Sequence, residues 1–176
     1  MKTIKFEEFM DDVDFFVDEA KKGKIFIYPT DTIYGIGGIW NEENIKKIAD
    51  IKNRDRNKMF SVIAPNFEWI QKNSECRIQN SELEEQLQKY HGVTWIFSYE
   101  KPGVRIIKHD FQKFVKKLGK GFITTSVNIS GEPAVTNLED LKPEIKEKID
   151  YIIDSGICEG KPSVLIDFVK GKIIER

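Results

Sequence analysis

Apolar residues in the first part of the chain recur at the spacing of an amphipathic helix. They are Phe6, Phe9, Met10, Val13, Phe16, Val17 and Ala20. Gly23 follows where such a helix would stop, and the apolar run 24–28 before Pro29 has the pattern of a short strand. The pattern therefore predicts one helix followed by one buried strand.

Helical patterns and apolar runs continue along the rest of the chain without strict alternation. We expect helices over 41–52, 81–89, 110–118 and 138–148, and strands over 59–64, 93–99, 104–107, 121–125, 151–154, 163–169 and near 173–174. Asn41 is a residue type that caps helices, and Lys101-Pro102-Gly103 is a turn signal between two strands. No repeat or low-complexity linker divides the series. We expect a single α/β domain over 1–176, with a mixed sheet and flanking helices.

The composition fits a globular domain that needs no covalent support. The chain has 176 residues, of which 40% are hydrophobic, and twelve are Phe. A chain of this size buries about 70% of its unfolded surface. The 28 Lys and Arg against 29 Asp and Glu give a net charge of −1, so any polyanion must bind at a local basic site.

The sequence also carries expectations about the compartment. Cys76 and Cys158 lie far apart without metal-ligand spacing, which favours reduced thiols. Acidic residues lie near the N-terminus at Glu7, Glu8, Asp11, Asp12 and Asp14, where a signal peptide would need an apolar run. No apolar run approaches the roughly 18 residues that span a membrane. We expect a cytoplasmic protein with no membrane association.

The segment 28–38, Tyr-Pro-Thr-Asp-Thr-Ile-Tyr-Gly-Ile-Gly-Gly, is dense in small hydroxyls and glycines. We expect its glycines, Gly35, Gly37 and Gly38, to let the backbone approach a ligand closely. It lacks the Gly-Lys-Ser/Thr ending of a Walker loop and the Gly-x-Gly-x-x-Gly frame of dinucleotide binders. The alternative is a plain strand and tight turn.

Two further segments carry polar chemistry. Residues 52–58, Lys-Asn-Arg-Asp-Arg-Asn-Lys, hold four cations that suit phosphate oxygens, although a solvated helix end is the alternative. Residues 122–133 hold five hydroxyl or amide side chains, among which Asn128 can both donate and accept. A polar strand edge is the alternative there. The Gly-rich stretch 154–167 is weak as a lone pattern.

Other catalytic patterns are missing from the sequence. His91 and His109 have no metal-ligand spacing, and there is no Gly-x-Ser-x-Gly elbow. Hydrolysis through an activated nucleophile is therefore disfavoured. Hydroxyls, amides, glycines and cations remain, which suit the positioning of phosphates and a small polar substrate.

Taken in order, these segments resemble the YrdC-like family of threonylcarbamoyl-AMP synthases. The matching motifs are Tyr-Pro-Thr-Asp-Thr-Ile-Tyr-Gly, Lys-x-Arg, Thr-Ser-x-Asn-x-Ser-Gly and Gly-x-Pro-Ser, over about 28–176. The resemblance implies a twisted mixed sheet around a large concave cleft. It implies a nucleotidyltransferase that joins L-threonine, bicarbonate and ATP into threonylcarbamoyl-AMP and pyrophosphate, for threonylcarbamoyl-adenosine modification of tRNA. Mg²⁺ would accompany ATP without dedicated protein ligands, and the product would pass to a tRNA-modifying transferase complex.

The resemblance also assigns roles to residues of this chain. Lys52 and Arg54 would be catalytic. L-Threonine would contact Thr32, Arg105, Ser126 and Ser163, with Arg105 pairing its carboxylate. ATP would contact Lys52, Arg54, Lys58, Asn128, Thr136 and Arg176.

The sequence departs from the family pattern at several places. Asp55 stands where the family usually has Pro, Ile63 where larger relatives have a histidine near threonine, and Val164 where a threonine closes the last motif. The segment 94–105 is shorter than usual. Three alternatives stay open. The first is an RNA-binding module, which would bind RNA weakly. The others are carbamoyl transfer through a carbamoyl-adenylate and a non-catalytic nucleotide-binding paralogue.

Overall fold

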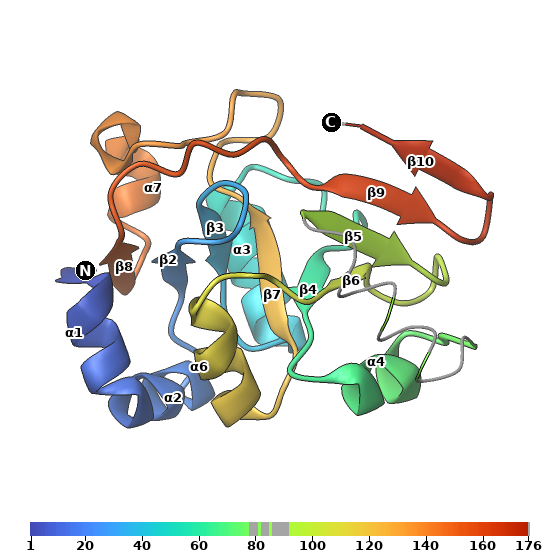
Figure 1. Cartoon of the computed structure of the whole chain (residues 1–176). Helices are drawn as coiled ribbons and strands as arrows, with labels where there is room; N and C mark the ends of the chain where they lie inside the picture. The colour runs from blue at the N-terminus through green and yellow to red at the C-terminus, as the bar shows by residue number, and fades with distance from the viewer. Residues whose placement is uncertain (78–80, 82–84, 86–91, 176) are drawn as a thin grey trace.

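The computed structural model of the chain describes residues 1–77, 81, 85 and 92–175. In this part of the chain, helices and strands interleave (Figure 1). The strands are β1 (Lys2–Lys5), β2 (Phe26–Tyr28), β3 (Gly35–Gly37), β4 (Ser61–Ile63), β5 (Val93–Ile96), β6 (Val104–Arg105), β7 (Phe122–Ser126), β8 (Tyr151–Asp154), β9 (Val164–Asp167) and β10 (Lys172–Ile174). The helices are α1 (Phe6–Asp11), α2 (Val13–Lys21), α3 (Glu42–Ile51), α4 (Phe67–Asn73), α6 (Phe111–Leu118) and α7 (Pro143–Lys146), with the 3-10 turn η1 (Leu138–Asp140).

The strands form one mixed sheet in the order β1-β8-β2-β3-β7-β4-β6-β5-β9-β10. Strand β7 connects the two halves of this sheet, because it pairs antiparallel with β3 on one side and with β4 on the other. The pairs β1·β8, β2·β8, β4·β6 and β5·β9 are parallel. The expected α/β class with a mixed sheet and flanking helices is confirmed.

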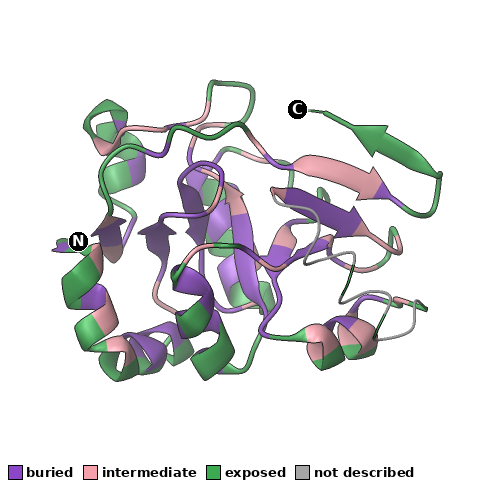
Figure 2. Cartoon of the chain, in the orientation of Figure 1, coloured by how far each residue is buried: buried purple, intermediate pink, exposed green. Residues whose placement is uncertain are grey.

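Successive residues of the central strands face opposite layers of core. Phe26 and Phe122 pack with Phe9 and Phe114 under α1, α2 and α6. Their neighbours Ile27 and Ile123 pack on the other side with Ile48 of α3 and Ile145 of α7. Figure 2 shows the buried strands enclosed by helices whose outer faces are exposed. The sheet is thus covered on both sides in the half of the molecule that contains β2, β3 and β7.

The N-terminal segment differs from the single helix that its pattern predicts. β1 comes first and pairs with β8, and the helix is divided into α1 and α2 at Asp12, where φ is −121° and ψ is 42°. β1 escapes sequence analysis because Ile4 is its one buried residue, so it shows no alternating pattern.

Other elements depart from expectation to differing degrees. The expected helix 41–52 is confirmed as α3, and the Asn41 side chain accepts a hydrogen bond from Asn44 N at 2.8 Å as its cap. The expected helix 138–148 is instead η1 followed by α7. Pro143 has no backbone N–H to donate inside a continuous helix, so it ends one and occupies the first position of the next. Helix α4 was not anticipated. The expected helix 81–89 lies almost wholly outside the described residues.

The glycines of segment 28–38 serve strand packing, and Gly35 also lines the cavity described below, so their expected close approach to a ligand stays a prediction. A Cβ on Gly37 would lie 1.8 Å from the carbonyl oxygen of Ile123 in β7. A Cβ on Gly35 would lie 2.9 Å from the ring of Tyr28, and one on Gly38 would lie 2.9 Å from the amide of Asn44. The glycines therefore let β3 lie close to β2, β7 and α3, and residues 35–37 form the strand β3, which the sequence patterns did not predict.

The aromatic core between α6 and the sheet should dominate stability. Phe114 is fully buried and its ring lies 5.3–5.4 Å from those of Phe9 and Phe122. We expect Phe114→Ala to lower the free energy of unfolding by about 3–5 kcal/mol, measured by urea denaturation. Phe15→Ala is the matched control, because Phe15 is 43% exposed and should cost much less. Equal losses in the two variants would contradict this packing.

Candidate functional site

A cavity of about 570 Å³ opens where the two halves of the sheet meet at β7. Its walls come from the loop after β2, the ends of β4, β5, β6 and β7, the turn after β7, and the start of β9. The volume lies in the range of small-molecule sites, about 300–1,000 Å³. The lining includes Arg54, from the predicted cation segment 52–58, and Arg105, to which the resemblance assigned the threonine carboxylate.

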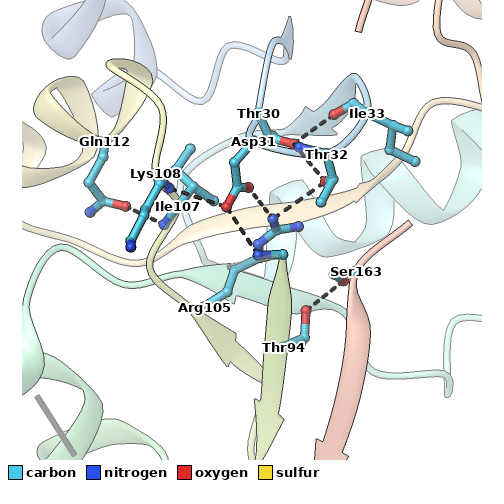
Figure 3. Close-up of polar contacts among 11 residues, drawn as sticks. Thr30, Asp31, Thr32, Ile33, Thr94, Arg105, Ile107, Lys108, Gln112 and Ser163 are labelled. Carbon is cyan, nitrogen blue, oxygen red and sulfur yellow. Dashed lines mark hydrogen bonds and ion pairs between the residues drawn. The ribbon is translucent and has the colours of Figure 1, made fainter. Parts of the chain in front are cut away.

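Arg105 is held at the cavity wall by a buried ion pair with Asp31 (Figure 3). Its Nη2 donates to Asp31 Oδ1 and lies 3.4 Å from Thr32 Oγ1. The two charged side chains are 6% and 8% exposed. Arg105 lines the cavity and Asp31 does not, so the carboxylate supports the guanidinium from behind.

Two hydroxyl pairs lie beside Arg105 in the cavity wall. Thr30 Oγ1 and Thr32 Oγ1 are 2.9 Å apart, and Thr94 Oγ1 and Ser163 Oγ are also 2.9 Å apart. The second pair joins β5 to the residue before β9. Hydroxyls can both donate and accept, so these pairs can reorganise around a polar ligand.

Lys52 lies beneath the cavity and is only 2% exposed. Its ammonium donates to Ser126 O at 2.5 Å, Asn128 O at 2.8 Å and Asn128 Oδ1 at 2.8 Å. Burial, and next the charge of Arg54, lower the pKa of Lys52 from 10.5 to about 8, so the charged form still prevails at pH 7. All three N–H donors of Lys52 thus bind the turn after β7.

The turn that Lys52 holds is itself tightly bonded. Ser126 Oγ donates to Asn128 Oδ1 at 2.6 Å, and Asn128 Nδ2 donates to the carbonyl of Glu132 at 2.7 Å. Both Ser126 and Asn128 line the cavity. Their side chains are therefore fixed in place before any ligand arrives.

Arg54 differs from Lys52 because part of its hydrogen-bonding capacity is unused. Its Nη2 donates to Met59 O at 3.0 Å, and its guanidinium carbon lies 4.8 Å from the centre of the Phe60 ring. Its Nε is buried without a hydrogen-bond partner among the described residues. A planar cation in a cavity wall with a free N–H suits a phosphate oxygen.

The structure brings most of the expected site residues to one cavity. Its lining includes Thr32, Arg54, Arg105, Ser126, Asn128 and Ser163. Lys52, Lys58 and Thr136 are not in the lining: Lys52 is buried below it, and Lys58 is exposed on the surface. Arg176, like His91, lies outside the described residues. The roles of all these residues stay predictions.

Several cavity residues were missed by sequence reasoning. Tyr99 and Lys101 reach the cavity from the β5–β6 connection, and Glu132 reaches it from the turn after β7. Asp31 was part of a recognised motif but received no role. Each is a common surface residue type, so only the contacts of the folded chain reveal it.

The connection from β8 to β9 is seated against the loop after β2. Tyr34 Oη donates to Gly156 O at 2.7 Å and accepts from Ser155 N at 3.0 Å. A Cβ on Gly160 would lie 2.1 Å from the carbonyl oxygen of Thr32. This close approach places Ser163 at the cavity and explains why the Gly-rich stretch is needed there.

Two features are absent from the residues that the structure describes. No group of three or more His, Cys, Asp or Glu side chains among them could hold a metal ion. None of the helices they form is both long and apolar enough to cross a bilayer.

Comparison with known proteins identifies relatives over nearly the whole chain. A family model described as Sua5_yciO_yrdC, "Telomere recombination", matches residues 18–176. A Methanocaldococcus jannaschii protein named "Putative threonylcarbamoyl-AMP synthase" is 32% identical over 174 residues, covering 92% of this chain and 83% of its own. The Pseudoalteromonas translucida "Threonylcarbamoyl-AMP synthase" is 24% identical over 169 residues, covering 86% of this chain and 90% of its own.

Solved structures show the same fold. The crystal structure of P. abyssi Sua5 complexed with L-threonine has a TM-score of 0.81 at 22% identity, covering 97% of this chain. This chain spans only 55% of that Sua5 chain. The crystal structure of E. coli YciO has a TM-score of 0.79 at 18% identity, covering 99% of this chain and 93% of its own.

The contacts of Lys52 predict a role in stability. Lys52→Met removes the donor of three buried hydrogen bonds, so we expect the free energy of unfolding at pH 7 to fall by about 1–3 kcal/mol. Urea denaturation measures this loss. Lys58→Met is the control at an exposed position and should change stability by less than about 0.5 kcal/mol. An unchanged stability for Lys52→Met would mean that the turn after β7 does not depend on the ammonium.

Proposed function

The chain belongs to the Sua5/YciO/YrdC family, and we propose that it is a threonylcarbamoyl-AMP synthase. It is an enzyme of the nucleotidyltransferase kind that uses L-threonine, bicarbonate and ATP and forms threonylcarbamoyl-AMP and pyrophosphate. The observation that carries the proposal is one cavity lined both by Arg105 with its hydroxyl pairs and by Arg54 with Asn128. The first set suits an amino acid, and the second suits a nucleotide.

The amino acid would bind through its carboxylate to Arg105, because a guanidinium pairs with carboxylates through parallel N–H donors. Thr32 and Ser163 line the same cavity, and their hydroxyls would bind the amine and side chain of L-threonine. Ser126 lines the cavity nearby and is fixed by Asn128. These residues would hold the amine free to react.

ATP would bind with its phosphates at Arg54 and the turn after β7. Arg54 offers its unpaired Nε, and Lys58 and Arg176 would supply further charge from the surface and the chain end. Asn128 and Thr136 would face the nucleotide. Lys52, which was expected to touch phosphate, would act through the turn that it holds, because its three donors are already used.

The reaction needs no protein nucleophile. Bicarbonate loses hydroxide to give carbon dioxide, the threonine amine adds to that carbon and loses a proton, and the proton and hydroxide form water, which leaves a carbamate. A carbamate oxygen then attacks the α-phosphorus of ATP, the bond to the bridging oxygen breaks, and pyrophosphate leaves. Because both reactants are anions, the protein contributes by aligning them and by neutralising phosphate charge.

Mg²⁺ would enter as the MgATP complex. The ion keeps several waters and is commonly held through substrate phosphates rather than by an all-protein cage. The donor set of the cavity suits this mode, because Glu132, a carboxylate in its lining, is already bonded to Lys142 at 2.6 Å. The product would pass to the enzymes that modify adenosine in tRNA.

The decisive experiment measures pyrophosphate release with ATP, Mg²⁺, L-threonine and bicarbonate, omitting each in turn. Mass spectrometry detects threonylcarbamoyl-AMP in parallel. We expect release only when all four are present. ATP and threonine binding without release would instead identify a non-catalytic paralogue. Salt-sensitive RNA binding with no nucleotide binding would identify an RNA module.

Arg54 gives the sharpest test of the phosphate site. We expect Arg54→Ala to lower pyrophosphate release by about 100-fold or more, by analogy with the loss of one oxyanion donor. Arg56→Ala is the control, since Arg56 lies two positions away and pairs with Asp50 on the surface. Turnover near that of the parent protein in Arg54→Ala would remove Arg54 from the phosphate site.

A further inference from the structure

We propose that Asp31 positions Arg105 so that an unpaired edge of its guanidinium meets the carboxylate of the amino-acid substrate. This inference rests on the proposed function and extends it to a residue that does not line the cavity. The arrangement is an ion pair in which one member faces the ligand and the other lies behind it.

The first observation is the incomplete bonding of Arg105. Its Nη2 binds Asp31, but its Nε is buried without a hydrogen-bond partner among the described residues. A buried N–H without a partner is costly, and such groups in folded proteins are few. The Nε itself is buried, but Arg105 lines the cavity, so an anionic ligand that contacts the guanidinium can supply an acceptor once the side chain adjusts.

The second observation is the bonding of Asp31 itself. Its Oδ1 accepts from Arg105, and its Oδ2 accepts from Lys108 N at 3.2 Å and from Gly92 N at 3.4 Å (Figure 3). The carboxylate therefore joins the loop after β2 to the start of β5 and to the segment after β6. Its orientation is fixed by two backbone groups that cannot rotate away.

These contacts hold the Asp31 carboxylate in one orientation, and Asp31 in turn fixes the orientation of the guanidinium. Arginine side chains lose much conformational freedom on binding, and a guanidinium already fixed in the bound orientation avoids that cost. Asp31 also balances the charge of Arg105 while the cavity is free of substrate. An arriving carboxylate then uses N–H groups that Asp31 leaves open, so the two carboxylates do not compete for one edge.

Asp31→Asn tests the proposal because it keeps the size of the side chain. Asp31 accepts from Arg105 with Oδ1 and from the backbone N–H groups of Gly92 and Lys108 with Oδ2. An amide has only one oxygen, so its NH2 group must face the donors at one of these two sites. We expect KM for L-threonine to rise about tenfold or more, with KM for ATP unchanged within about twofold. Asp110→Asn is the control, since Asp110 is an exposed carboxylate paired with Lys113.

A second readout does not require turnover. Phenylglyoxal labelling, followed by mass spectrometry of the peptide that contains Arg105, reports how firmly the guanidinium is held. We expect labelling of Arg105 to be faster in Asp31→Asn than in the parent protein, with labelling of Arg56 unchanged. If Asp31→Asn does not fold, Asp31→Glu takes its place with the same expectations, because the longer side chain displaces the carboxylate.

The outcomes separate this proposal from the proposed function. Threonine and ATP KM values that rise together, or an unchanged threonine KM with unchanged labelling, would overturn the role of Asp31 while leaving the synthase activity in place. If the parent protein makes no threonylcarbamoyl-AMP, the proposed function fails. Labelling of Arg105 then still decides whether Asp31 fixes the guanidinium.

Discussion

The pairing of β7 with β3 on one edge and β4 on the other is the constraint on which the site depends. It joins two groups of strands into one sheet, and the cavity lies where they meet. The carbonyl of Ile123 occupies the space where a side chain at position 37 would lie. Only glycine at this position therefore allows β3 to lie so close to β7. At the end of β7, Ser126 enters the cavity and the chain turns into the segment that Lys52 holds.

The cations at and below the cavity are bonded in two different ways. Lys52 is compact, and its ammonium carries three donors that all bind protein oxygens. Arg54 and Arg105 are planar, with more donors than the protein satisfies, and each keeps a buried Nε without a partner among the described residues. This difference follows from the side chains: an arginine can bind its support and its ligand at the same time, whereas a fully bonded ammonium cannot.

Sequence patterns predicted the fold class and many of the residues that line the cavity, but they did not predict the contacts between distant segments. Periodicity located α3 and the capping residue Asn41, and the motif resemblance placed Thr32, Arg105, Ser126 and Ser163 at one cavity. The patterns failed at β1 and β3, whose short strands are stabilised by pairing with β8 and β7 rather than by an apolar alternation. Asp31 was equally hidden, because its partners lie 61 to 77 positions away in sequence.

At two positions that depart from the family pattern, Asp55 and Ile63, the side chain makes local contacts and does not line the cavity. Ile63, where larger relatives have a histidine, is fully buried in the core with Phe122 and is absent from the cavity lining. The Asp55 carboxylate accepts from Asn57 N at 2.9 Å, so a side-chain turn stands where proline would fix the backbone. The short β5–β6 connection still delivers Tyr99 and Lys101 to the cavity. A chain with a core residue in place of a histidine, and a bonded turn in place of a proline, still has Arg54 and Arg105 in the cavity wall, with Arg105 paired to Asp31.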